Sequence, residues 1–591
     1  MYDYGLIGNC QTAALVSRSG SIDWLCFPRP DSPPVFGRLL DEEGGCFSIE
    51  ALGKSTVEQS YISNTNILLT RYRTENGAEF TITDFCPRFV QFGRMFRPLA
   101  LFRIVEPVGG SATVRVRCKP VSGWEKEPVP PIRGSSHLRF ETGRGYMRLA
   151  TNMPLTYLSE EVSFVLKETL FFGLSWGYGI EDDIVRLSRQ FLDQTAAYWR
   201  KWVQHCSIPV LYQKETIRSA LALKLHCYED TGAILAALTT SLPENPGEGR
   251  NWDYRFCWLR DAYFVLSAFH KLGHFEEMEE FLKFLLDIAS HHEYSREKLR
   301  PVYSLDQSAP LPEREHPQWA GYGGSKPVRS NNQAAEHVQN DVYGETILTL
   351  TPIFLDERFQ HLRTRNHEDL LIHLTHLCVR NIGRPDAGLW ELRNGWREHS
   401  FSNLMIWAGL ERASRIKESG FLRELNIDLA ECQAKARQAI ESAVKDGSLR
   451  NGATDASFDS ASLLLPLLRY PDRSLCQATV NAIARELRYE NNASQASFLY
   501  RYVRKDDFGR PSSSFLICSF WLAQAFARLG QMTEARKVME DVLQSANHLG
   551  LLSEHYRPEE RRQCGNFPQA YSHVGLINAA FETSPSWDQV M

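Results

Sequence analysis

The chain has 591 residues, of which 43% are hydrophobic and 23% charged, and its formal net charge is -5. This length exceeds what one hydrophobic core fills, so at least two domains are expected. The small net charge gives no electrostatic reason to expect a nucleic acid or an anionic membrane as a partner, and neither is predicted.

The N-terminus and the cysteines favour a cytoplasmic protein. The opening Met-Tyr-Asp-Tyr-Gly lacks the basic and apolar regions of a signal peptide, and the most apolar later run, 515–526, is too short to span a bilayer. Thirteen cysteines without a Cys-x-x-Cys pair are typical of reduced core residues rather than of a disulfide framework or a zinc site. No metal and no cofactor are predicted.

Residues 1–180 have the pattern of β structure. Pairs of apolar runs flank Ser19-Gly20 and Asn76-Gly77, two dipeptides that favour hairpin turns. Further strand-like runs, separated by turn residues, lie at 99–105, 112–118, 146–150 and 162–174. The pattern predicts an N-terminal antiparallel β-sandwich, followed by a helical linker over 181–214.

Residues 215–591 have apolar residues at three- and four-residue spacing, which predicts a helical domain. Twelve candidate helices begin near Thr216, Phe256, Phe275, Ala334, His367, Asn403, Asn426, Phe458, Ser474, Phe515, Thr533 and Pro568. Connections after the odd-numbered helices are mostly long, and those after the even-numbered ones are mostly short. In a ring of alternating helices the long connections share one end, so the prediction is a multidomain β + α protein whose second domain is an (α/α)6 barrel with one functional face.

The stretch 250–262 crowds aromatic residues, arginines and aspartates into one turn-to-helix passage. Buried charges need partners, whereas aromatic faces beside fixed hydrogen-bonding groups suit a neutral polyhydroxylated ligand such as a sugar ring. The alternative is an interdomain salt-bridge cluster capped by aromatic rings, and this stretch alone does not decide between the two.

Two loop glutamates could supply the chemistry of glycoside hydrolysis. A glycosidic bond needs one carboxylic acid that protonates the leaving oxygen and a second carboxylate that activates water or attacks carbon. Glu391 precedes the sixth candidate helix, and Glu554 precedes the twelfth. Trp390 could exclude water from the neighbouring Glu391. Taken singly, a loop glutamate is usually only solvated.

Several stretches resemble the motifs of glycoside hydrolase family 15, the glucoamylase-like enzymes and their trehalase relatives. The similar segments are 250–262, 336–345, 388–393 and 565–573, and the openings 3–8 and 20–25 are similar to the N-terminal domain of the bacterial members. In this order, over nearly the whole chain, the motifs are far more specific than any one alone. The resemblance implies a β-sandwich, an (α/α)6 barrel and an inverting hydrolase that removes terminal α-linked glucose.

The resemblance also implies a role for individual residues. Glu391 matches the family's general acid and Glu554 its general base. The residues that match the binding site of the non-reducing glucose are Tyr254, Trp258, Arg260, Asp261 and Trp390. Leu392 and Asn403 depart from the family pattern, since fungal glucoamylases carry a second Glu at the first position and many bacterial relatives carry Lys at the second.

The sequence therefore predicts an exo-acting, inverting α-glucosidic hydrolase of glucoamylase type, which releases β-glucose from an oligosaccharide or disaccharide. An α,α-trehalase of the same family is the near alternative. A non-catalytic glycan-binding or scaffold protein is the alternative from another class. Linkage, chain-length preference and oligomeric state remain open.

Overall fold

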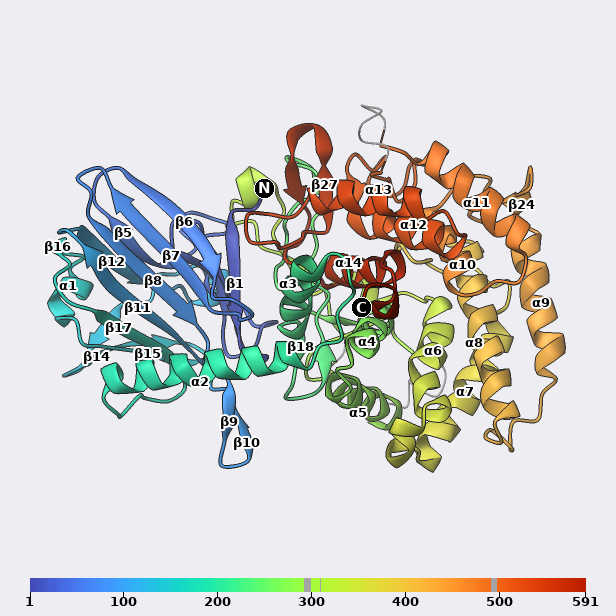
Figure 1. Cartoon of the computed structure of the whole chain (residues 1–591), viewed down its shortest axis with the longest axis horizontal. Coiled ribbons are helices and arrows are strands. Elements are labelled where there is room, and N and C mark those ends of the chain that lie inside the picture. Colours follow the sequence, from blue (N-terminus) through green and yellow to red (C-terminus); the bar gives the residue numbers. More distant parts are fainter. Residues whose placement is uncertain (292–298, 309, 490–496) are drawn as a thin grey trace.

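The structure is a computed structural model that describes residues 1–291, 299–308, 310–489 and 497–591. An N-terminal β domain and a larger helical domain lie side by side, joined by the long helix α2 (Ile184–Gln204) (Figure 1). Within the described residues, no helix is long and apolar enough to cross a membrane.

The β domain contains two antiparallel sheets, of seven and eight strands in the described residues. The first has β1 (Tyr4–Gly8), β2 (Ala13–Ser17), β3 (Ile22–Cys26), β5 (Cys46–Ala51), β12 (Thr113–Lys119) and β16 (Phe164–Val165) in this order, with β4 (Pro34–Phe36) beside β3. The second has β13 (Pro131–Arg133), β14 (His137–Thr142), β15 (Gly145–Thr151), β17 (Leu170–Trp176), β11 (Ala100–Gly109), β8 (Glu79–Phe85), β7 (Leu68–Thr74) and β6 (Ser55–Tyr61). Outside both sheets lie the hairpin β9 (Phe89–Gln91) and β10 (Arg94–Phe96) and the short helix α1 (Leu155–Ser159).

Both predicted hairpins are present. β2 pairs with β3 around Ser19-Gly20, and β7 pairs with β8 around Asn76-Gly77. Gly20 and Gly77 have φ of 69° and 80°, which a glycine adopts without a Cβ clash. The predicted single strand over 162–174 is wrong, because the chain leaves the first sheet after β16, exposes Lys167 and Glu168, and enters the second sheet at β17.

The two sheets face each other across an apolar core. Phe47 of the first sheet meets Phe172 of the second edge to face, with ring centroids 5.7 Å apart. On the outer face of the second sheet, Phe191 of α2 packs against Phe102 at 5.4 Å. Asp183 caps α2 by accepting a hydrogen bond from the Val185 amide. The predicted linker helix therefore begins directly after this capping residue.

The helical domain contains twelve further α-helices in its described part. They are α3 (Gln213–Lys224), α4 (Leu259–Leu272), α5 (Glu276–His291), α6 (Asp341–Leu355), α7 (Arg365–Asn381), α8 (Ser400–Glu418), α9 (Leu429–Glu441), α10 (Leu464–Leu467), α11 (Arg473–Glu486), α12 (Leu516–Arg528), α13 (Met532–Leu543) and α14 (Ala570–Thr583). Short strands in its loops are β18 (Cys227–Tyr228), β19 (Ala233–Ile234), β20 (Cys257–Trp258), β21 (Val302–Tyr303), β22 (Arg314–Glu315), β23 (Arg329–Ser330), β24 (Val444–Lys445), β25 (Ser448–Leu449), β26 (Ser514–Phe515), β27 (His555–Arg557) and β28 (Arg562–Cys564).

Two predicted helix starts are displaced. The helix expected from Ala334 begins only at Asp341, because residues 333–336 form a 3-10 turn, η4, and the next four residues run along the loop before α8. The helix expected near Phe458 is a 3-10 turn, η6 (Ser460–Leu463), followed by the single turn α10.

Within the helical domain, α4, α6, α8, α12 and α14 form an inner group. α4 packs against α6, α6 against α8, α12 against α14, and α14 against α4, while η6 contacts α8 and α12. Five other helices each pack against one member of this group, α5 on α4, α7 on α6, α9 on α8, α13 on α12 and α3 on α14. The loops that precede the inner helices therefore come together at one end.

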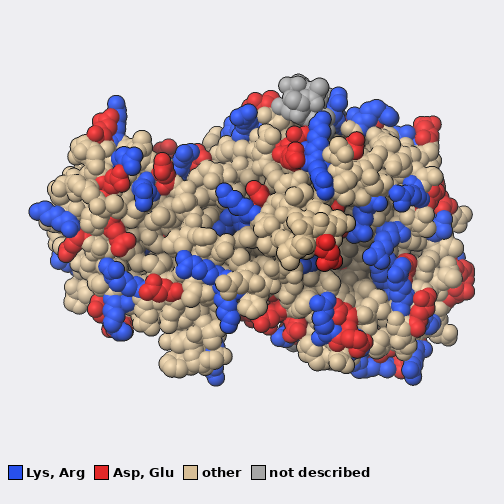
Figure 2. Space-filling view, in the orientation of Figure 1, with Lys and Arg blue, Asp and Glu red and all other residues tan. Residues whose placement is uncertain are grey.

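The two domains share buried contacts. The Trp24 indole N–H donates to the Leu238 carbonyl at 2.8 Å, and the Tyr2 hydroxyl donates to the Gly565 carbonyl at 3.1 Å. Arg88 of the β domain forms a two-point ion pair with Glu229, at 2.6 and 3.0 Å. Positive and negative side chains are interspersed over the face shown in Figure 2.

Candidate active site

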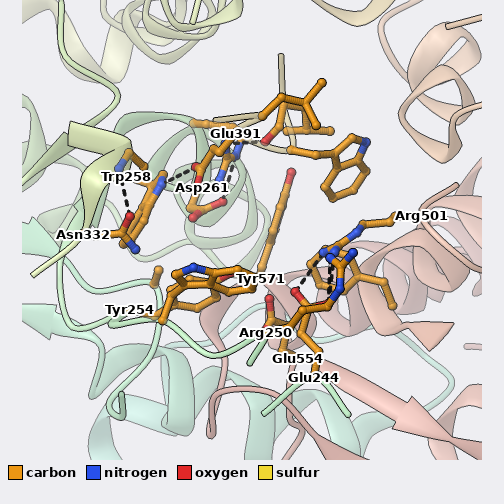
Figure 3. Close-up of a pocket in the computed structure, with 18 of the residues that line it drawn as sticks. Glu244, Arg250, Tyr254, Trp258, Asp261, Asn332, Glu391, Arg501, Glu554 and Tyr571 are labelled. Atoms are coloured by element: carbon orange, nitrogen blue, oxygen red, sulfur yellow. Dashed lines mark hydrogen bonds and ion pairs between the residues drawn. The ribbon is translucent and has the colours of Figure 1, made fainter. Parts of the chain in front are cut away.

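The loops at the end of the inner helices enclose a pocket of about 860 Å³, part of which opens to solvent. All seven residues predicted for the site line it: Tyr254, Trp258, Arg260, Asp261, Trp390, Glu391 and Glu554. Figure 3 shows Glu391 and Glu554 at opposite edges of this pocket. The structure thus brings together side chains that are up to 300 positions apart in the sequence.

Side chains of the stretch 250–262 lie in two different places. Asp253 and Arg255 are buried and paired at 2.7 Å, and Arg255 also donates to the Ser32 carbonyl of the β domain at 2.6 Å. Tyr254 and Trp258 line the pocket, with ring centroids 5.3 Å apart. The stretch therefore contributes both to an interdomain ion-pair cluster and to the wall of the pocket.

Arg260 and Asp261 lie in the first turn of α4. The Arg260 guanidinium donates to Asp261 Oδ1 at 3.3 Å and to the Leu389 carbonyl at 3.0 Å, so it ties α4 to the loop that carries Glu391. Burial raises the pKa of Asp261 to about 6, against the opposing charge of Arg260. The carboxyl group therefore titrates close to neutral pH.

Glu391 is held in a tight turn. Its φ of 60° is unusual for a residue with a Cβ, and its amide donates to the Gly388 carbonyl at 3.1 Å. Glu391 Oε1 accepts hydrogen bonds from Trp258 Nε1 at 2.6 Å and Arg260 Nη1 at 3.2 Å. Both donors come from the start of α4, which fixes the direction of this carboxyl group.

Trp390 forms part of the wall beside Glu391. Its indole N–H points at Asp459, with both carboxylate oxygens at 2.9 Å, and its ring packs against Phe515 at 5.5 Å. The indole N–H is therefore engaged, and the ring is what Trp390 presents to the pocket.

Glu554 is only 2% exposed and is positioned mainly by backbone contacts. Its amide donates to the Asn566 carbonyl at 3.1 Å, and the Asn566 amide donates back to Oε2 at 3.3 Å. A Cβ at Gly565 would lie 2.5 Å from Oε2, so only glycine fits beside this carboxylate. Gly565 and Asn566, at the start of the segment 565–573, thus hold the Glu554 side chain in place.

The sequence prediction missed a charged network at the other edge of the pocket. Glu244 accepts two hydrogen bonds from Arg501, both at 3.0 Å (Figure 3). Arg250 pairs with Asp506. These partners lie in different loops without a shared local pattern, so no signal in the sequence pairs them. Tyr571 also lines the pocket, and it does lie inside the segment 565–573 that the resemblance had picked out.

One group of side chains has the spacing of metal ligands in the described residues. Ligand atoms of Glu244, Glu554 and His555 all lie within 4.8 Å of one another. Both oxygens of Glu244 already accept from Arg501, so the group has the bonding of an ion-paired carboxylate rather than that of a cation ligand.

Two known protein families match this chain. Residues 211–581 match glycosyl hydrolases family 15, and residues 3–168 match the trehalase-like N-terminal family. Trehalases of Mycolicibacterium smegmatis and Thermoplasma volcanium are both 31% identical, over 98% of this chain and 90% and 92% of their own lengths. A solved bacterial glucoamylase complexed with acarbose has the same fold, with a TM-score of 0.67 and 14% identity over 99% of this chain and 94% of its own.

The family match covers the pocket and the inner helices, and the relatives are similar over almost the whole chain. The chain therefore belongs to glycosyl hydrolase family 15, and it is a glycoside hydrolase with a trehalase-like N-terminal domain.

Proposed function

We propose that the enzyme is an inverting α,α-trehalase. The observation that carries the hydrolase reaction is the pair of oriented carboxyl groups, Glu391 and Glu554, in one pocket with aromatic and charged side chains. The sequence alone favoured a glucoamylase, with trehalase as the alternative. The relatives that span the full chain are named trehalases, which supports the alternative instead.

The proposal extends to the architecture. The packing order of the inner helices, with α14 returning to α4, supports an (α/α)6 barrel over residues 215–591. The loops before the inner helices then form its functional face, and the β domain over residues 1–180 supports that face from the side through Tyr2, Trp24 and Ser32.

Glu391 acts as the general acid. Two N–H groups donate to its Oε1, and among the described residues none donates to Oε2. The proton to be transferred is therefore carried on Oε2, and it goes to the glycosidic oxygen as the bond to carbon breaks. Trp258 and Arg260 then stabilise the carboxylate that this transfer leaves behind.

Glu554 acts as the general base. It removes a proton from a water molecule that attacks the anomeric carbon on the face opposite the leaving group, which inverts the configuration at that carbon. Arg260 and Asp261 hold hydroxyl groups of the glucose unit that is attacked, and the Tyr254 and Trp258 rings form its apolar walls.

A substrate panel with anomer-resolved detection tests the proposal. Glucose release is measured with trehalose, maltose, isomaltose and dextrin, and trehalose is expected to have the highest kcat/KM. One unit of trehalose leaves as α-glucose and the attacked unit becomes β-glucose, so proton NMR of the fresh product is expected to show equal amounts of both anomers.

Other outcomes would refute specific parts. Only α-glucose from trehalose would mean a retaining enzyme, in which the two carboxyl groups lie about 5 Å apart rather than roughly 6.5 to 9.5 Å. Preference for maltose or dextrin would restore the glucoamylase assignment. Binding of the sugars with no glucose released from any of them would favour the glycan-binding alternative.

A further inference from the structure

His337 is a buried histidine beside the loop that carries Glu391. It follows η4 and directly precedes a segment bonded to that loop, where the Ala387 amide donates to the Val338 carbonyl at 2.9 Å and Gln339 Nε2 donates to the Gly388 carbonyl at 2.7 Å. These contacts fix its backbone relative to the acid. The His337 side chain lines the same pocket.

Both ring nitrogens of His337 lack a hydrogen-bond partner in the described chain, although the residue is only 5% exposed. The Trp396 ring lies edge to face with the His337 imidazole, with ring centroids 6.0 Å apart and an interplanar angle of 73°. Buried polar groups are almost always paired, by protein, water or ligand. Two unmatched nitrogens at the wall of a pocket therefore indicate a group that enters the pocket.

Three other polar residues that line this pocket, Asn332, Arg393 and Asp507, have partners already. Asn332 Oδ1 accepts from the Ala334 amide at 2.9 Å, and the Arg393 guanidinium pairs with Glu313 at 2.8 Å. Asp507 accepts from the Arg393 amide at 2.6 Å. Two other lining residues, Leu392 and Phe508, are apolar. His337 is thus the side chain of this group with free capacity for a polar ligand.

The protonation of His337 suits a hydroxyl group. Burial lowers the pKa of its imidazole, against the opposing charge of Glu391, so the ring is neutral at pH 7. A neutral imidazole has one N–H donor and one acceptor nitrogen, and a sugar hydroxyl can both accept and donate.

We propose that His337 binds a hydroxyl group of the leaving sugar, next to Glu391, and so helps to select the sugar on that side of the scissile bond. This inference rests on the proposed hydrolase reaction but adds a specificity residue to it. Leu392, where the resemblance places a glutamate that contacts the adjacent sugar, offers no hydrogen bond. His337 supplies that contact from a different segment.

The test compares two substrates in His337→Ala. On the disaccharide that the wild type hydrolyses best, kcat/KM is expected to fall about tenfold or more, since a polar contact to the leaving sugar is lost. On α-glucosyl fluoride, whose leaving group is no sugar, the fall is expected to be less than about threefold. His337→Asn, which keeps a donor and an acceptor, should recover part of the loss. Equal losses on both substrates, or no loss on either, would overturn the proposal.

A matched control separates sugar binding from disturbance of the loop. His399 is also buried, at 4% exposure, and its ring lies against Gly388 of the same loop, but it does not line the pocket. His399→Ala is expected to change both substrates by the same factor. A selective loss on the disaccharide in this variant would overturn the assignment, because displacement of the loop would then explain both results.

The pH profile separates sugar binding from an effect on the acid. Loss of a contact to the leaving sugar leaves the alkaline limb of kcat/KM unchanged in His337→Ala, because that limb reports the general acid of the free enzyme. A shifted limb would mean that His337 positions Glu391, and would overturn the proposal.

The wild-type panel distinguishes failure of this inference from failure of the trehalase proposal. If trehalose is not hydrolysed but another disaccharide is, the trehalase proposal fails, and the His337 comparison is run on that disaccharide. If no disaccharide is hydrolysed, both proposals fail.

Discussion

At the scale of single residues, Glu391 and Glu554 carry the same carboxyl group in different settings. Glu391 receives its hydrogen bonds from the side chains of Trp258 and Arg260, whereas Glu554 receives one from the Asn566 amide. The acid and the base respond differently to the leaving group, so kinetics on two substrates tests the proposed roles.

Substitution of the two glutamates assigns their roles. Glu391→Gln is expected to lose about 10² to 10⁴ in kcat on the preferred disaccharide and much less on α-glucosyl fluoride, because fluoride leaves without a proton. Glu554→Gln is expected to be impaired on both substrates, since each needs an activated water. Steady-state kinetics on the pair measures this, and the reverse pattern would exchange the roles.

Protonation of Asp261 is predicted to lower kcat/KM on the acid side of the pH profile. Its pKa of about 6 means that the anionic acceptor is present above pH 6 and is lost as the pH falls through 6. The variant Asp261→Asn is expected to lower kcat/KM by about 1.5 to 3 kcal/mol at pH 8, and by less at pH 5, where the wild-type residue is itself neutral. Parallel pH profiles of the two proteins would contradict this.

At the scale of elements, helix α6 carries two carboxyl groups into the interior. Asp341 and Glu345 are fully buried, and none of their four oxygens has a partner in the described chain. Asp386 lies beside this helix end, and it accepts from the Asn340 amide at 2.7 Å and from the Ser402 hydroxyl at 2.8 Å. Burial raises the pKa of Asp341 to about 6 and that of Asp386 to about 7.

These groups predict a stability that falls as the pH rises from about 4 to about 7. A carboxyl whose pKa is raised in the folded state favours folding below its unfolded pKa, near 3.8, and loses that contribution as the pH rises through the folded value. Asp341→Asn, a neutral isostere, is therefore expected to stabilise the protein by about 1 to 3 kcal/mol at pH 8 and to have little effect at pH 4.

Thermal unfolding at the two pH values measures this effect. The control is Asp446→Asn, because the Asp446 side chain is 92% exposed and is expected to leave the midpoint unchanged at both. A loss of stability in Asp341→Asn at pH 8 would show that the ionised carboxylate has a partner in solution.

At the scale of the whole molecule, the β domain supports the catalytic loops. Tyr2 holds the carbonyl of Gly565, whose neighbour Asn566 donates to Glu554, and Arg255 bridges the pocket segment to Ser32. The orientation of the site therefore depends on both domains. The relatives are similar over nearly the full chain and not over the helical part alone.

The ion pair between Arg88 and Glu229 predicts that the folded protein loses stability at acid pH. Burial opposes ionisation of Glu229, but Lys224 and Arg88 outweigh it and hold its pKa at about 2. A lowered pKa contributes stability above the unfolded value, near 4.5, and this contribution is lost as the pH falls toward 2.

Replacing the arginine should reveal this contribution. Arg88→Gln is expected to cost roughly 1.5 to 3 kcal/mol at pH 7, because a charge-assisted bond is lost while Lys224 still neutralises Glu229. The difference from wild type should narrow below pH 4. Denaturant unfolding at pH 7 and at a pH below 4 measures the difference in the free energy of unfolding between variant and wild type. A difference that does not depend on pH would exclude the ion pair as its source.

Local signals account for the parts of the fold that the sequence predicted well. The turns at Ser19-Gly20 and Asn76-Gly77 need only their own residues, and an amphipathic helix such as α2 carries its cap and its apolar face in one stretch. The start of α6 and the break between β16 and β17 depend on distant partners, so the local pattern placed them wrongly.

The sequence by itself determined the two-part architecture, because each part has its own local pattern, and its resemblance to family motifs indicated the candidate acid and base and the candidate sugar-binding residues. Only the tertiary structure decided which charges meet. Arg501 pairs with Glu244 across 257 positions, and Arg255 reaches the other domain while its neighbour Tyr254 faces the pocket. The unmatched nitrogens of His337 likewise exist only in the fold, since burial and missing partners are properties of packing and not of a segment.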